Sequence, residues 1–154
     1  MPSKFVQALG KRLDARPDRL DLRDREFAPP VASLPARFPD DPTVRTLLSA
    51  YVRAGLILSQ GNEGACTGFG LACVVNYLFW RRAQDSAPTR GKKVECVSTR
   101  MLYHLARFYD EWPGEDYDGS SCRGALKAWN KHGVCSEALW PYRDRGGKVT
   151  FIKP

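Results

Sequence analysis

Apolar residues recur at helical spacing in several stretches of the chain, and each stretch predicts a helix. One opens with Asp41 as N-cap and Pro42 in the first turn, and it ends at Gly55, a residue type that favours helix ends. The longest, over residues 66–83, is apolar on nearly every side, as expected of a helix buried at the centre of a domain. The pattern therefore predicts a mostly helical fold built around this central segment.

Two further helices are predicted closer to the C-terminus. The first begins at Ser98 or Thr99 and continues to Tyr109. The second begins at one of the serines 120–121 and stops at Gly133, because serine favours N-caps and glycine favours helix ends.

The two ends of the chain have a different pattern. Residues 1–38 are rich in proline and arginine and are interpreted as an extended lead-in that wraps a surface, with a short helix at 5–13. Residues 39–154 form the predicted folded domain. At its end, residues 143–148 are predicted as a turn and 149–152 as a strand for which the sequence offers no partner.

Composition narrows the class of protein. The chain has 154 residues, 43% apolar and 27% charged, which suits one globular domain. Its net charge of +7 comes from 24 basic residues interleaved with 17 acidic ones, and this mixing argues against a nucleic-acid partner. The absence of a run of about 18 apolar residues argues against a membrane span. Five cysteines, an odd number, favour free thiols and a cytoplasmic location.

The most specific chemical signal lies just before the central helix. Cys66 follows a glycine-rich turn and begins that helix, where unpaired N–H groups and the positive end of the helix dipole favour a thiolate. Gln60 lies six residues upstream, and its side-chain amide is a candidate donor to an oxyanion. This grouping predicts acyl-transfer chemistry. The alternatives are a buried structural thiol at Cys66 and a Gln60 amide that bonds the backbone of the turn.

Two other motifs each lack a feature that the function they resemble requires. Residues 68–73 resemble a loose dinucleotide fingerprint but lack a preceding strand, so the glycines at 68 and 70 are interpreted as sites of close helix packing. Cys122, His132 and Cys135 lack the paired spacing of a zinc site. Neither a metal nor an organic cofactor is therefore expected.

The turn and the cysteine together resemble the signature of the papain-like cysteine peptidases. Residues that fit the pattern are Gln60, Gly61, Gly64, Ala65 and Cys66. Two positions depart from it: Glu63 stands where secreted members usually carry a disulfide cysteine, and Thr67 replaces the usual aromatic residue. A weaker likeness extends over residues 21–142.

This resemblance implies a fold and a site. The fold would be α+β: the mostly helical left-hand subdomain of a papain-like enzyme, with its central helix led by Cys66 and its β-barrel half absent. The activity would be peptide-bond hydrolysis, with Cys66 as nucleophile and Gln60 in the oxyanion hole. Residues expected to bind the peptide or protein substrate are Gly64, Asp118, Gly119 and Ser120. For Asp118, a solvated loop carboxylate is the alternative.

The same resemblance also implies an incomplete catalytic site. The partner histidine and asparagine would lie about 130–150 residues after the cysteine, whereas the sequence ends at Pro154 and its two histidines, His104 and His132, come too early. The chain alone is therefore expected to be inactive, either as a truncated fragment or as a half-enzyme completed by a chain that carries the histidine. The alternative is a non-catalytic module that binds peptides in the papain-like cleft. An exposed apolar side of the central helix is expected if that other half is absent.

Overall fold

The computed structural model describes residues 15–28, 30, 39–86, 91, 93–112, 117–145 and 148–149. Within these ranges the chain forms four helices and one short two-stranded ribbon. The helices are α2 (Asp41–Arg53), α3 (Cys66–Asp85), α4 (Thr99–Phe108) and α5 (Cys122–His132). The ribbon pairs β1 (Asp144–Arg145) with β2 (Lys148–Val149) in antiparallel fashion. The helix predicted at 5–13 and the strand predicted at 150–152 lie outside the described residues.

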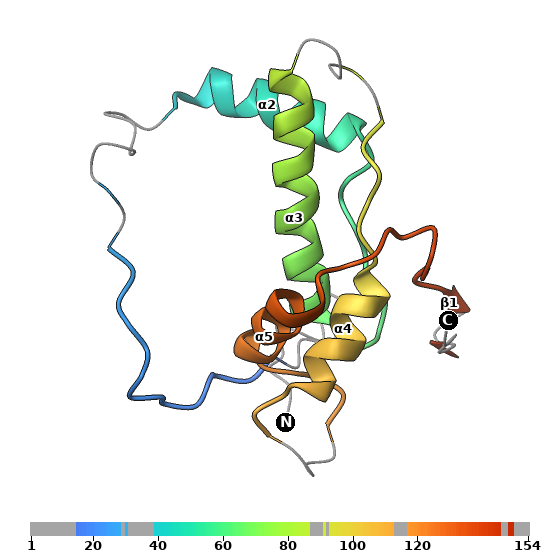
Figure 1. Cartoon of the computed structure of the whole chain (residues 1–154). Coiled ribbons are helices and arrows are strands. Elements are labelled where there is room, and N and C mark those ends of the chain that lie inside the picture. The colour runs from blue at the N-terminus through green and yellow to red at the C-terminus, as the bar shows by residue number, and fades with distance from the viewer. Residues whose placement is uncertain are drawn as a thin grey trace, which may run out of the picture.

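Helix α3 is the central element, and the other helices divide between its two ends (Figure 1). Helix α2 crosses near the C-terminal end of α3, where Tyr51, Leu56 and Trp80 form a buried cluster. Helices α4 and α5 lie together beside the N-terminal end of α3. The predicted mostly helical fold with a central helix led by Cys66 is thus confirmed, and Cys66 lies at the end of α3 where three helices meet.

Short polar side chains set the beginnings of three helices. Asp40 caps α2, since its Oδ1 accepts the Thr43 N–H at 2.9 Å. The prediction of Asp41 as N-cap was therefore wrong by one residue: Asp41 is already inside the helix, and the neighbouring acid does the capping. Ser98 caps α4 through a bond from the Met101 N–H, 3.0 Å long.

The last helix begins and ends as the sequence predicts. Ser121 caps α5 by accepting the Gly124 N–H at 3.1 Å. Gly133 ends it with a φ of 66°, a left-handed conformation that residues with a Cβ rarely adopt. The bounds of α5 are therefore set by its two caps. Its first residue, Cys122, lies beside the start of α3.

The prediction that α3 is buried nearly all round is only half right. Ala72 and Val75 pack with Val97 and Leu102 in the core between α3 and α4. On the opposite side of α3, Val74 and Leu78 lie one turn apart and expose 55% and 54% of their surface. This is the apolar side that the sequence led us to expect in water. The helix also continues to Asp85, two residues past its predicted end.

The C-terminal ribbon corrects two further predictions. Asp144 pairs with Val149 and Arg145 with Lys148, so part of the segment predicted as a turn is a strand. Val149 therefore has a partner, contrary to the prediction of an unpaired strand, and the partner is the chain just before it. A hairpin this short is visible only from backbone pairing, because two residues carry no periodic pattern.

Among the helices described, none is long and apolar enough to cross a bilayer.

Candidate functional site: the thiol at the start of the central helix

Cys66 is the first residue of α3 and is partly exposed. The N-cap of this helix is Ala65, which has no side-chain acceptor to offer, whereas the N-caps of α2, α4 and α5 are Asp or Ser side chains that accept a backbone N–H. The first N–H groups of a helix lack intrahelical partners and carry its positive dipole end. The thiol of Cys66 therefore lies at the one described helix start that is built without a side-chain cap.

The turn that leads to Cys66 is held by two hydrogen bonds at Gln60. The buried Gln60 side chain donates from Nε2 to the carbonyl oxygen of Glu63 at 2.9 Å. The Gln60 carbonyl in turn accepts the Tyr142 hydroxyl at 2.7 Å. Gly61 supports the turn with a φ of 62°. One of the two N–H bonds of the Gln60 amide thus stabilises the turn, which is the alternative that the sequence left open, and the oxyanion role of Gln60 stays a prediction.

The loop that contains the other expected substrate residues lies against the same end of α3. Ser120 is fully buried, and its hydroxyl shares a hydrogen bond with that of Thr67, the residue after Cys66. Asp118 is exposed, and its backbone carbonyl accepts the Tyr103 hydroxyl. Gly64 and Gly119 are buried. The structure therefore brings the loop and the cysteine together, while their part in binding substrate stays a prediction.

A largely apolar groove of about 290 Å³ lies beside Cys66, between α3 and α5. Its lining comprises Ala15, Cys66, Thr67, Gly70, Leu71, Val74, Cys122, Ala125 and Leu126. Neither Gly119 nor Ser120 is part of this lining. Sequence reasoning missed the wall supplied by α5, because nothing in the spacing of the chain shows that the start of α5 lies next to Cys66.

The groove has a second thiol. Cys122 is exposed and is the first residue of α5. Partial desolvation of its sulfur raises the pKa of Cys122, and the negative charge of Asp18 raises it further. Cys122 therefore ionises less readily than an ordinary thiol.

Both histidines of the chain are engaged elsewhere. His132, at the last position of α5, shares a hydrogen bond of 2.7 Å between its Nε2 and the Tyr109 hydroxyl. The ring of His104 packs on that of Trp140, with 5.5 Å between centroids. Neither imidazole lines the groove beside Cys66. In the part of the chain that the structure describes, no three His, Cys, Asp or Glu side chains gather so as to hold a metal ion.

The segment before α2 runs along the edge of this region. Arg16 forms a parallel bridge with Ser121, and its guanidinium lies 4.2 Å from the centre of the Tyr117 ring. Asp18 accepts the Arg123 N–H at 2.9 Å. Asp24 accepts two bonds from the Arg123 side chain, and this hydrogen bonding lowers the pKa of Asp24. This part of the N-terminal segment is therefore tied to the first turn of α5.

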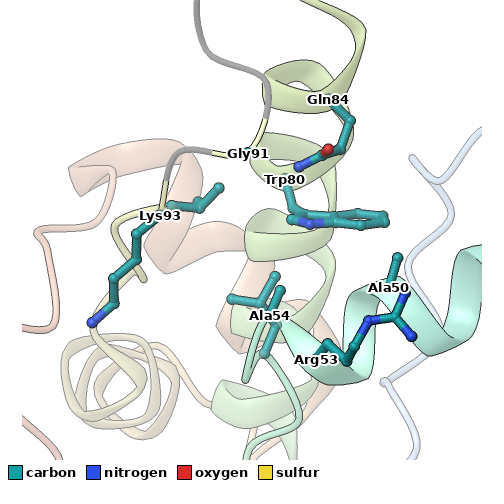
Figure 2. A pocket seen from close by; sticks show the side chains of 9 residues that line it. Ala50, Arg53, Ala54, Trp80, Gln84, Gly91 and Lys93 are labelled. Carbon is teal, nitrogen blue, oxygen red and sulfur yellow. The ribbon is translucent and has the colours of Figure 1, made fainter.

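A second hollow, of about 560 Å³, lies at the opposite end of α3 (Figure 2). Trp80 stands beside it, with Gln84 above and Ala54 below in the view, and Arg53 and Lys93 line it as cations. The Lys93 ammonium and the Arg53 guanidinium point away from each other. Because the two charges do not converge on one point, these two cations do not form a binding site for a single anionic group.

Comparison with known proteins places the fold near one class of enzyme. No family model matches the sequence, and no curated protein matches it either. Among solved structures, the fold is similar to that of a cysteine protease. That protein is xylellain from Xylella fastidiosa, which matches with a TM-score of 0.56 and 26% sequence identity over 88% of this chain and 44% of its own. The chain thus spans less than half the length of that protease, and the likeness agrees with the papain-like resemblance only at the level of fold and class.

Proposed function

We propose that Cys66 is the nucleophile of a cysteine-type peptidase. The observation that carries the proposal is its position: a partly exposed thiol at the start of a 20-residue helix that lacks a side-chain cap. The Cys66 sulfur attacks the carbonyl carbon of a peptide bond, the amine leaves, and water then hydrolyses the thioester. The N–H of Cys66 and the Gln60 amide stabilise the oxyanion that forms on attack. The structural likeness to a cysteine protease supports this reading.

The proposed mechanism needs a base that the described residues do not bring to the groove. A thiol nucleophile is activated by a neighbouring imidazole, and a protonated imidazole is also needed to release the amine. The two histidines of the sequence bond Tyr109 and pack on Trp140 instead. We therefore propose that residues 1–154 alone turn over no peptide, and that a segment outside them, on the same chain or on a complementing one, supplies the histidine. Peptide turnover that is absent for residues 1–154 and appears when a histidine-bearing segment is joined or added to them would support this part of the proposal.

The direct test is the rate at which each of the five cysteines is alkylated between pH 4 and 9, read by mass spectrometry. An ordinary thiol, with a pKa of about 8.5, is almost wholly protonated at pH 6 and reacts slowly there. We expect Cys66 to react at pH 6 well ahead of the other four, because it is partly exposed and begins a helix that has no side-chain cap. Equal rates for all five thiols at pH 6 would contradict the proposal.

A second candidate function is supported by the groove itself. A largely apolar groove of about 290 Å³ can hold the side chains of an extended peptide without any covalent step. A binding module of this kind predicts that peptide affinity is the same for the wild type and Cys66→Ser. It also predicts a loss of affinity in Leu126→Asp, which places a charge on the wall of the groove.

A further inference from the structure

We propose that Arg100 is a positioning residue for the thiol site, acting through Glu63 on the turn that precedes Cys66. This inference rests on the proposed function of Cys66. Arg100 is not among the residues that line the groove, and it lies in the first turn of a different helix, α4. Its influence on the thiol would therefore pass through the backbone of residues 60–65.

Two features of its surroundings make the position of Arg100 energetically unfavourable for a positive charge. Its side chain is only 1% exposed, and a guanidinium taken out of water loses several kcal/mol of hydration free energy unless it is paired. It is also the second residue of α4, where the positive end of the helix dipole repels a cation. A positive charge in such a place must be held by specific partners, and these partners show what the residue does.

The main charged partner is on the turn before Cys66. Arg100 Nη1 lies 2.9 Å from Glu63 Oε1, and the Glu63 side chain is only 13% exposed. Glu63 also supplies the carbonyl oxygen that accepts the Gln60 amide. The ion pair therefore fixes the very residue on which the Gln60 side chain rests.

The second partner closes the network. The Arg100 guanidinium carbon lies 4.5 Å from the centre of the Tyr142 ring, a favourable position for a cation over an aromatic face. The hydroxyl of this same ring donates to the Gln60 carbonyl. Its edge packs on Phe69, in the first turn of α3, with 4.8 Å between the centroids and an angle of 88°. Arg100 thus contacts two residues that both hold Gln60, and one of them also packs on the helix that Cys66 begins.

The network is anchored to α4 at a further point. Glu137 accepts the Tyr142 N–H through one carboxylate oxygen and the Thr99 N–H through the other, the latter at 3.2 Å. Thr99 precedes Arg100 at the start of α4. The start of α4 therefore holds Tyr142 from its backbone side while Arg100 lies on its ring, and the turn 60–65 is fixed relative to a rigid helix.

Two variants test this inference in the full chain. Arg100→Lys keeps a positive charge but removes the planar guanidinium that pairs with a carboxylate and stacks on a ring. Tyr142→Phe keeps the ring under Arg100 and removes only the hydroxyl bond to Gln60. The matched control is Arg107→Lys, which changes an exposed arginine on the same helix, 6.0 Å from the Tyr103 ring.

The main readout is the rate of Cys66 alkylation at pH 6 relative to that of Cys73 in the same molecule. A loosened turn displaces the start of α3 and with it the thiol, so we expect Arg100→Lys and Tyr142→Phe each to slow the alkylation of Cys66 on the order of tenfold. The rate of Cys73 should be unchanged, and Arg107→Lys should match the wild type. Hydrogen exchange of the amides of residues 61–66 should be faster in both variants and unchanged in the control.

Each other outcome has a defined meaning. Unchanged alkylation of Cys66 and unchanged exchange at 61–66 in both variants would overturn the inference. Faster alkylation of all five cysteines in both would overturn it as well, because it would show a general loss of folding; should only Arg100→Lys unfold, Tyr142→Phe decides. If wild-type Cys66 shows no advantage at pH 6, the proposed function fails, and positioning of the turn is then judged by exchange alone.

Discussion

Gly68 of α3 and Tyr103 of α4 approach so closely that a Cβ atom on Gly68 would lie 2.6 Å from the Tyr103 backbone nitrogen. No real side chain tolerates such a contact with backbone, so the two helices can pack in this way only around a glycine. The contact lies two residues after Cys66. The position of the candidate nucleophile relative to α4 therefore depends on the smallest side chain in the helix.

Gly68→Ala is expected to destabilise the fold by about 1–3 kcal/mol, because the added methyl group forces α3 and α4 apart. The matched control is Gly70→Ala in the same helix, where an added Cβ meets nothing within 4 Å. That change should be neutral or stabilise by up to about 1 kcal/mol, since alanine favours a helix more than glycine does. Urea unfolding of both variants measures the difference, and equal stabilities would contradict the close contact.

The two glycines show how far the sequence alone could go. Both were interpreted as sites of close helix packing, yet this is confirmed for Gly68 and wrong for Gly70, which is exposed. Periodicity predicts that a helix exists and which side is apolar, but not which residue meets the neighbouring helix. The same limit explains Asp40 and Asp41, adjacent acids of which either can cap a helix.

The candidate site was predictable where its signal is local. Ten consecutive residues predict that Cys66 begins a helix, and the structure confirms this. The contacts that hold the site are not local: Glu63 and Arg100 are 37 residues apart, and Gln60 and Tyr142 are 82 apart. No spacing rule links such pairs, because tertiary packing alone brings them together. Cys122 was missed as a neighbour of Cys66 for the same reason.

The alkylation rates of Cys122 and Cys96 should rise only at a higher pH than that of an ordinary thiol. Partial desolvation raises the pKa of Cys122, and the charge of Asp18 adds to this effect. Burial also raises the pKa of Cys96, assisted by the negative charge of Glu137. Since only the thiolate reacts, both residues should need a higher pH than a free thiol in a peptide. Their alkylation in the folded chain should lag behind that in urea at pH 8, and equal rates would show that neither thiol is shielded.

Asp110 should make the free energy of unfolding depend on pH in the acidic range. Burial would raise the pKa of its carboxyl, but hydrogen bonds from the Tyr117 hydroxyl and the Ser121 N–H outweigh burial and lower it. A lowered folded pKa means that the stabilisation is complete above the unfolded value of about 3.9 and is lost as the pH falls through the folded one. Asp110→Asn should therefore lower stability at pH 7 and reduce its fall between pH 5 and 2.

The measurement for Asp110 is the urea midpoint across that pH range. The control variant is Glu95→Gln, which changes an exposed carboxylate and should leave the curve as it is. A fall in stability between pH 5 and 2 that is identical in the wild type and Asp110→Asn would show that other carboxylates cause it.

Tyr103 should resist ionisation in the folded chain. Burial raises the pKa of Tyr103 to about 12, and its hydroxyl donates to the Asp118 carbonyl. Its contribution to stability is therefore full below the unfolded value of about 10 and is lost as the pH rises through the folded value. In Tyr103→Phe, stability should depend less on pH between 10 and 12. A tyrosinate absorbance at pH 10 that the folded wild type shows and folded Tyr103→Phe lacks would contradict this.

The exposed side of α3 should make the chain associate with itself. Val74 and Leu78 lie one turn apart along that side, and their exposed apolar surface can be removed from water by contact between two copies. We expect the wild type to form dimers or larger species as its concentration rises, measured by sedimentation velocity. The double variant Val74→Gln and Leu78→Gln should shift this equilibrium toward the monomer. Leu139→Gln, which removes an apolar residue exposed outside α3, is the control and should associate like the wild type. A wild type that stays monomeric at millimolar concentration would show that this surface is too small to drive association.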